Sequence, residues 1–140
     1  MSDEAVVAAC RSIWPKDKGD CSAFARDVAH SLGIALAGDA DDIVDQISGS
    51  GWKQISGGAA AAQAAEDGQF VIAGLRGDQQ QLPSAHGHVV VVVGGEPAQG
   101  KYPYAYWGRL GGVGAENKTI NWAWRAGDRD HVVYAAKSLA

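Results

Sequence analysis

The chain has 140 residues, of which 46% are hydrophobic and 20% charged, a composition typical of a folded globular protein. Its length suits one domain, residues 1–140, and is short for two. The 12 basic and 16 acidic residues give a net charge of −4 without long runs of either sign. We therefore expect no nucleic-acid binding. No segment has the roughly 18 apolar residues of a membrane span, so we expect no membrane insertion.

Helical patterns fill the first half of the chain. The four predicted helices are 4–14, 20–33, 40–47 and 58–67. Pro15 is expected to end the first of them. Asp20 is a good N-cap for the second, and Gly33 suits the position just after its end. Cys10 lies on the apolar face of the first helix, and we interpret it as a packing residue.

From residue 69 onward the pattern becomes that of β-strands. The predicted strands are QFVIAG (69–74), HVVVVVGG (88–95), YPYAYWG (102–108), TINWAW (119–124) and HVVYAA (131–136). The five valines at 89–93 are apolar on both faces, which places their strand in the middle of a sheet. Helices followed by consecutive strands predict an α+β fold, with helices packed on a mainly antiparallel sheet. The long polar connection 74–87 is of a kind that often carries function, and we ask whether it covers a substrate.

Cys21 occupies the first position of the second predicted helix, in GDCSAFARDVAHSLG. The unpaired N–H groups and the dipole of a helix N-terminus favour a thiolate there. The same N–H groups can bind an oxyanion. Because Cys21 also begins the apolar face of its helix, buried packing is the alternative interpretation.

The candidate base for this cysteine is His88, the first residue of the predicted central strand. Gly87 precedes it and allows another segment of chain to approach closely. Catalytic cysteines pair with histidines that are distant in sequence, so the separation is no objection. His86 and His88 could instead form half of a metal site. Its other ligands would have to be His131, Cys21 or scattered carboxylates, and we expect neither a metal nor a cofactor.

Two short motifs occur together in this sequence. Asp20-Cys21-Ser22 begins a predicted helix, and Gly87-His88-Val89 begins a predicted central strand that ends in two glycines. This combination resembles the NlpC-type cysteine peptidases. These are papain-like enzymes that cut cell-wall peptides. The resemblance implies that Cys21 is the nucleophile and His88 the acid and base. Asp20, Ser22 and Gly87 would support the site. The Cys21 N–H is the first candidate for the oxyanion hole, and Ser22 is the second.

Enzymes of this type usually place a third polar residue on the strand after the histidine strand, where it orients the imidazole. Here that strand reads YPYAYWG, which has no His, Asn, Gln or Asp. Tyr104, Tyr106 or a backbone carbonyl could take this role, or the enzyme could use a Cys–His dyad.

A closer resemblance covers most of the chain. It rests on six segments in this order: VVAACRSIW, GDCSAFARDVAHSLG, FVIAGLRG, GHVVVVVGG, KYPYAYWGRLGG and DRDHVVYAAKSLA. Together they resemble the first family of type VI secretion amidase effectors. These small NlpC-type enzymes are injected into rival Gram-negative bacteria. The resemblance implies cleavage of the γ-D-glutamyl–meso-diaminopimelate bond in peptidoglycan stem peptides. It also implies two protein partners, a cognate immunity protein and a component of the type VI apparatus.

The sequence also bears on localisation. The N-terminal MSDEAVVAAC lacks the basic and apolar parts of a secretory signal. We expect a monomer that is made in the cytoplasm and secreted by the type VI system into the periplasm of target bacteria. Two alternatives remain, a housekeeping or phage-borne cell-wall peptidase and a non-catalytic module that binds wall fragments through its aromatic residues.

Four side chains are candidates for binding the carboxylates of a stem peptide: Arg76, His86, Lys101 and Arg109. Each lies close in sequence to the segments that form the presumed cleft. The aromatic residues of 102–107 and 122–124 are interpreted as core, with stacking on sugars as the alternative. The segment RAGDRD (125–130) is predicted to be a turn with internal ion pairs.

Overall fold

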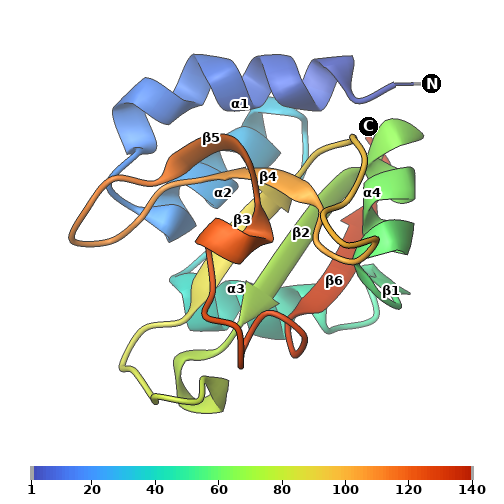
Figure 1. Ribbon diagram of the computed structural model, residues 1–140. Helices are drawn as coiled ribbons and strands as arrows, with labels where there is room; N and C mark the ends of the chain where they lie inside the picture. Colours follow the sequence, from blue (N-terminus) through green and yellow to red (C-terminus); the bar gives the residue numbers. More distant parts are fainter. Residues whose placement is uncertain (1, 140) are drawn as a thin grey trace.

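A computed structural model of the protein describes residues 2–139 and contains one six-stranded antiparallel sheet with helices on both faces (Figure 1). The helices are α1 (Glu4–Asp17), α2 (Cys21–Ser31), α3 (Ala40–Ile47) and α4 (Gly58–Glu66). The strands are β1 (Lys53–Ile55), β2 (Phe70–Leu75), β3 (His88–Val92), β4 (Tyr104–Trp107), β5 (Ala115–Thr119) and β6 (Val133–Lys137). Their order in the sheet is β1-β6-β2-β3-β4-β5. The predicted α+β fold is confirmed. None of the helices in residues 2–139 is long and apolar enough to span a membrane.

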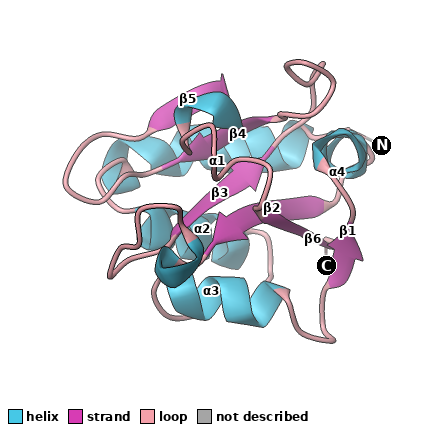
Figure 2. Cartoon of the chain, turned by 60° about the horizontal axis from the view of Figure 1, so that its bottom comes forward, coloured by secondary structure: helices cyan, strands magenta, loops and turns pink. Residues whose placement is uncertain are grey.

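Two apolar cores lie on opposite faces of the sheet. Val89 and Val91 of β3 pack with α1, α2 and α3, whereas Val90 and Val92 pack with α4 and the segment that follows β5. All four side chains are fully buried. Figure 2 shows α2 and α3 packed along β2 and β3, away from α4. β3 is thus the central strand that its run of valines predicts.

Helix α2 is fixed at both its start and its buried face. The Asp20 carboxylate accepts hydrogen bonds from the N–H groups of Ser22 and Ala23, at 3.1 and 3.2 Å. Phe24 and Val28 have no exposed surface and face the sheet. The chain leaves the helix at Gly33, whose φ of 79° suits glycine. The predicted N-cap and the predicted end are both confirmed.

The first helix does not end at Pro15, as its sequence predicts, but continues to Asp17. A proline in the last turn of a helix removes only one backbone hydrogen bond, and little helix follows it. The indole N–H of Trp14 also donates to the Trp107 carbonyl at 2.9 Å, which holds this end of α1 against the end of β4.

The predicted strand at 119–124 is wrong. Residues Ile120–Trp122 form a short 3-10 helix, and the strand β5 lies just before it. A strand would place residues 120, 122 and 124 on one face. Instead Ile120 and Trp124 are buried in the same core while Trp122 is 68% exposed, which is the geometry of a helical turn. The short edge strand β1 was not predicted, because it has only three residues and none is fully buried.

The loop after β4 holds the segment that leads into α2. The N–H groups of Arg109 and Gly114 both donate to the Lys18 carbonyl, at 3.0 and 2.8 Å. A Cβ atom added at Gly108 would lie 2.3 Å from the Asp17 carbonyl oxygen and 2.6 Å from that of Asp20. Because this contact is with backbone, only glycine allows the two segments to lie so close.

Replacing Gly108 by alanine should therefore displace the segment before Cys21. We expect Gly108→Ala to lower the free energy of unfolding by about 1–3 kcal/mol, as overpacking usually does. Gly112→Ala in the same loop is the control, because its Cβ would meet the Arg109 side chain at an ordinary 3.6 Å. Urea denaturation of both variants measures the difference, and equal stability of the two would contradict the close contact.

Candidate active site

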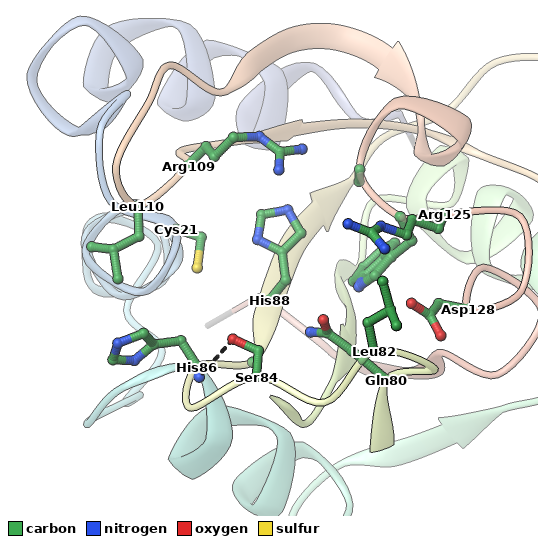
Figure 3. Close-up of a pocket in the computed structure, with 13 residues that line it drawn as sticks. Cys21, Gln80, Leu82, Ser84, His86, His88, Arg109, Leu110, Arg125 and Asp128 are labelled. Atoms are coloured by element: carbon green, nitrogen blue, oxygen red, sulfur yellow. Dashed lines mark hydrogen bonds between the residues drawn. The ribbon is translucent and has the colours of Figure 1, made fainter. Parts of the chain in front are cut away.

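Cys21 and His88 line the same surface cavity, which has a volume of about 390 Å³ (Figure 3). Cys21 comes from the start of α2 and His88 from the start of β3. The other walls are the loop after β2, the loop after β4 and the turn before β6. The remaining lining residues are Gln80, Leu82, Ser84, His86, Gly87, Arg109, Leu110, Ala123, Trp124, Arg125 and Asp128.

Cys21 is buried, with 5% of the residue exposed. Burial raises its pKa above the ordinary value, and the nearby Asp20 carboxylate adds to this. The backbone N–H groups of Val89, Ser22 and Cys21 itself lower the pKa, but by less. The helix N-terminus therefore acts in the expected direction, yet burial outweighs it. Burial thus favours the protonated thiol over the thiolate that the helix N-terminus stabilises.

His88 is also a neutral group at neutral pH. Burial lowers its pKa from 6.5 to about 3, and the positive charge of Arg109 contributes further. Its ring packs edge-on against two indoles, that of Trp124 at a centroid distance of 5.2 Å and that of Trp107 at 6.3 Å. Its Nε2 atom is buried and has no hydrogen-bond partner among residues 2–139. Packing, rather than a hydrogen bond to Nε2, sets the orientation of the ring.

Neither tyrosine of β4 takes the role of the third residue. The Tyr106 phenol lies near α1. Burial is the main cause of its raised pKa, and Cys10, Arg11 and Asp3 also act on this pKa. The Tyr104 ring borders Gly95, beyond the far end of β3. Within the described part of the chain, no third residue is hydrogen-bonded to the His88 ring, and Cys21 and His88 are called the dyad below.

The three predicted support residues lie beside the dyad. The Asp20 carboxylate accepts hydrogen bonds from the Ser22 N–H at 3.1 Å and from the Ser22 hydroxyl at 2.8 Å. Ser22, the second candidate donor for an oxyanion, is therefore already hydrogen-bonded to Asp20. The Cys21 N–H is not used by this cap. A Cβ atom at Gly87 would lie 2.5 Å from an Asp41 carboxylate oxygen and 2.8 Å from the Leu75 carbonyl oxygen. Glycine therefore permits the close approach that the sequence predicts.

Two of the four predicted substrate-binding side chains line the cavity and two do not. His86 and Arg109 face it. Arg76, the residue after β2, pairs with Asp45 of α3 at 2.7 Å and with Asp78 at 3.2 Å. Lys101 lines a separate depression near the start of α4. Sequence proximity to the cleft was misleading for these two, because Arg76 pairs with a carboxylate of α3 and Lys101 lies beside the start of α4.

Several polar residues that line the cavity were missed by the sequence analysis, namely Gln80, Ser84, Arg125 and Asp128. Asp128 is 4% exposed and accepts from the Gln81 N–H at 2.7 Å, which ties the loop after β2 to the turn before β6. The segment 125–130 is a turn as predicted. The expected internal ion pairs are not among the salt bridges of residues 2–139.

Other predictions about single residues can also be compared with the structure. Cys10 is fully buried in the core under α1, as expected for a packing residue. Of the aromatic residues predicted as core, Tyr102, Tyr106, Trp107 and Trp124 are buried, Tyr104 is half-buried and Trp122 is exposed. His86, the other half of the alternative metal site, lies before β3, whereas His88 is the first residue of that strand. No cluster of three metal-ligating side chains occurs in the described residues.

A helix that begins at a cysteine, packed on an antiparallel sheet whose central strand begins with a histidine, is the arrangement of papain-like amidases of the NlpC type. No model of a known protein family matches the chain. Peptidoglycan amidase Tse1 of Pseudomonas aeruginosa strain PAO1 is 36% identical over 149 aligned residues, which cover 99% of this chain and 92% of that protein. The chain therefore belongs to the family of this amidase, the first family of type VI secretion amidase effectors that its sequence resembles.

The lowered pKa of His88 should make the protein less stable in acid. Between pH 6.5 and about 3, only the unfolded state protonates this histidine, so the free energy of unfolding falls as the pH drops through this window. The slope has an upper limit of about 1.4 kcal/mol per pH unit. His88→Gln should remove this component, as urea denaturation across the window would reveal.

The comparison between wild type and variant also cancels the opposite effect of Asp17. Burial raises the pKa of that carboxyl to about 6, which stabilises the folded state as the pH falls. His131→Gln, at an exposed histidine, is the control. If the wild type and His88→Gln have parallel stability profiles, His88 is not held neutral by the fold.

Proposed function

We propose that this protein is a cysteine amidase that hydrolyses the bond between γ-D-glutamate and meso-diaminopimelate in peptidoglycan stem peptides. The observation that carries the proposal is the meeting of Cys21 and His88 in one cavity. The relationship to a peptidoglycan amidase over nearly the whole chain supports the substrate class.

In the first half of the reaction, the Cys21 sulfur attacks the γ-glutamyl carbonyl carbon. Because both groups are neutral at rest, His88 takes the thiol proton as the carbon–sulfur bond forms. The carbonyl oxygen becomes an oxyanion, for which the Cys21 N–H is the nearest helix-terminal donor. His88 then gives the proton to the diaminopimelate nitrogen, the carbon–nitrogen bond breaks, and the free amine leaves.

In the second half, water resolves the thioester. His88 accepts a proton from the water as its oxygen attacks the acyl carbon, and the carbon–sulfur bond breaks. The proton returns to the sulfur, so the thiol and the neutral imidazole are restored. The Val89 N–H, which acts on the Cys21 pKa, faces the sulfur and stabilises the charge that develops on it in both halves.

The family relationship also supports a biological role. We propose that the protein is an effector that a type VI secretion apparatus delivers into the periplasm of a rival Gram-negative cell. A cognate immunity protein would protect the producing cell, which has the same peptidoglycan bond. The cleft is the part of the molecule that such a protein would have to block or distort.

The test is digestion of purified Gram-negative peptidoglycan, with the products identified by mass spectrometry. The wild type should release fragments ending at γ-D-glutamate. Cys21→Ala should lower the turnover by at least about a thousandfold, because it removes the nucleophile. Cys10→Ala is the matched control, since this cysteine is buried under α1 and lines no part of the cleft.

Two other outcomes would replace the proposal. Cleavage by Cys21→Ala at the wild-type rate would exclude Cys21 as the nucleophile. Binding of peptidoglycan by both proteins without cleavage by either would favour a wall-binding module.

A further inference from the structure

The cavity around the dyad is locally positive in a protein whose net charge is −4. Arg109 and Arg125 both line it, and its one lining carboxylate, Asp128, already accepts a backbone hydrogen bond from Gln81. His86 and His88 are the remaining titratable nitrogen groups on its walls. Two arginines in a partly enclosed cleft attract an anionic ligand, because the surrounding protein screens their charge less than water does.

Arg125 is the arginine that the fold itself does not use. Arg109 donates to the Trp122 carbonyl at 3.1 Å, so part of its guanidinium supports the loop. Arg125 is exposed, and none of the salt bridges or side-chain hydrogen bonds found in residues 2–139 involves its guanidinium. Arg129, four residues on, packs over the Tyr102 ring instead, away from the cleft. A guanidinium with all its donors free suits bidentate binding of a carboxylate.

The position of Arg125 relative to the dyad indicates which part of a substrate it meets. In Figure 3, His88 stands between Cys21 and Arg125. The acyl group of the substrate bonds to Cys21, whereas His88 must reach the nitrogen of the leaving group to protonate it. Arg125, beyond the histidine, therefore lies on the leaving-group side of the scissile bond.

We infer that Arg125 binds the free side-chain carboxylate of the leaving diaminopimelate residue and thereby selects diaminopimelate over lysine at this position. This inference rests on the proposed function, which identifies the leaving group. Diaminopimelate differs from lysine by this one carboxylate, at the far end of the side chain. A charge-assisted pair that only one of the two residues can form gives the cleft a means to distinguish them.

The experiment compares two synthetic stem peptides that differ only at this carboxylate, which is free in one and converted to a carboxamide in the other. We expect the wild type to cleave the free acid with a kcat/KM about ten- to a hundredfold higher. Arg125→Gln should reduce this ratio to near one, mainly by slowing cleavage of the free acid. Arg125→Lys should keep part of the preference. Arg76→Gln is the matched control, because that arginine is paired with Asp45 outside the cleft.

The outcomes separate the inference from the proposed function. If Arg125→Gln cleaves both peptides with the wild-type ratio, the inference is wrong and the proposed function stands. If Arg125→Gln instead loses discrimination between D-glutamate and D-isoglutamine on the acyl side, the assignment to the leaving group is wrong. If the wild type cleaves neither peptide, the proposed function fails and the inference fails with it. Thermal denaturation of each variant excludes misfolding as the cause of any loss.

Discussion

The burial of β3 on both faces of the sheet is the constraint on which the site depends. Val89 and Val91 belong to one core and Val90 and Val92 to the other, so a shift of one residue would exchange the two sets and disturb both. The strand therefore has one register, and His88 at its start has one position. Helix α2, packed against this strand through Phe24, brings Cys21 to the same end.

The same burial acts on the protonation of Cys21 and His88. A thiol and an imidazole that are largely excluded from water favour their neutral forms, since an isolated charge in that environment is costly. Trp107 and Trp124 pack edge-on against the imidazole, so packing positions the ring. In the proposed reaction, charge on the pair would therefore develop only as the substrate carbonyl accepts the sulfur.

The sequence predicted what local patterns determine. Asp20 followed by Cys21 indicated the start of α2, and five consecutive valines indicated a central strand. Side chains whose surroundings come from distant segments were predicted poorly. Arg76 resembled a substrate ligand until Asp45, 31 residues away, proved to be its partner. Arg125 resembled a turn residue with an acidic partner, and only the fold brings it to the cleft. The strand predicted at 119–124 was wrong because alternating apolar and aromatic residues resemble a strand even when they form a helical turn.

The reacting pair and the walls of the cleft are built by different means. Cys21 and His88 stand on a helix and a strand that pack in the apolar core, whereas the walls are loops held mainly by hydrogen bonds. The Gln81 N–H donates to Asp128, and the N–H groups of Arg109 and Gly114 donate to the Lys18 carbonyl. Substitutions in the walls can therefore change which peptides bind while leaving the dyad where it is. Under the proposed function, the residues that choose the peptide and the residues that cut it are therefore held by separate parts of the fold.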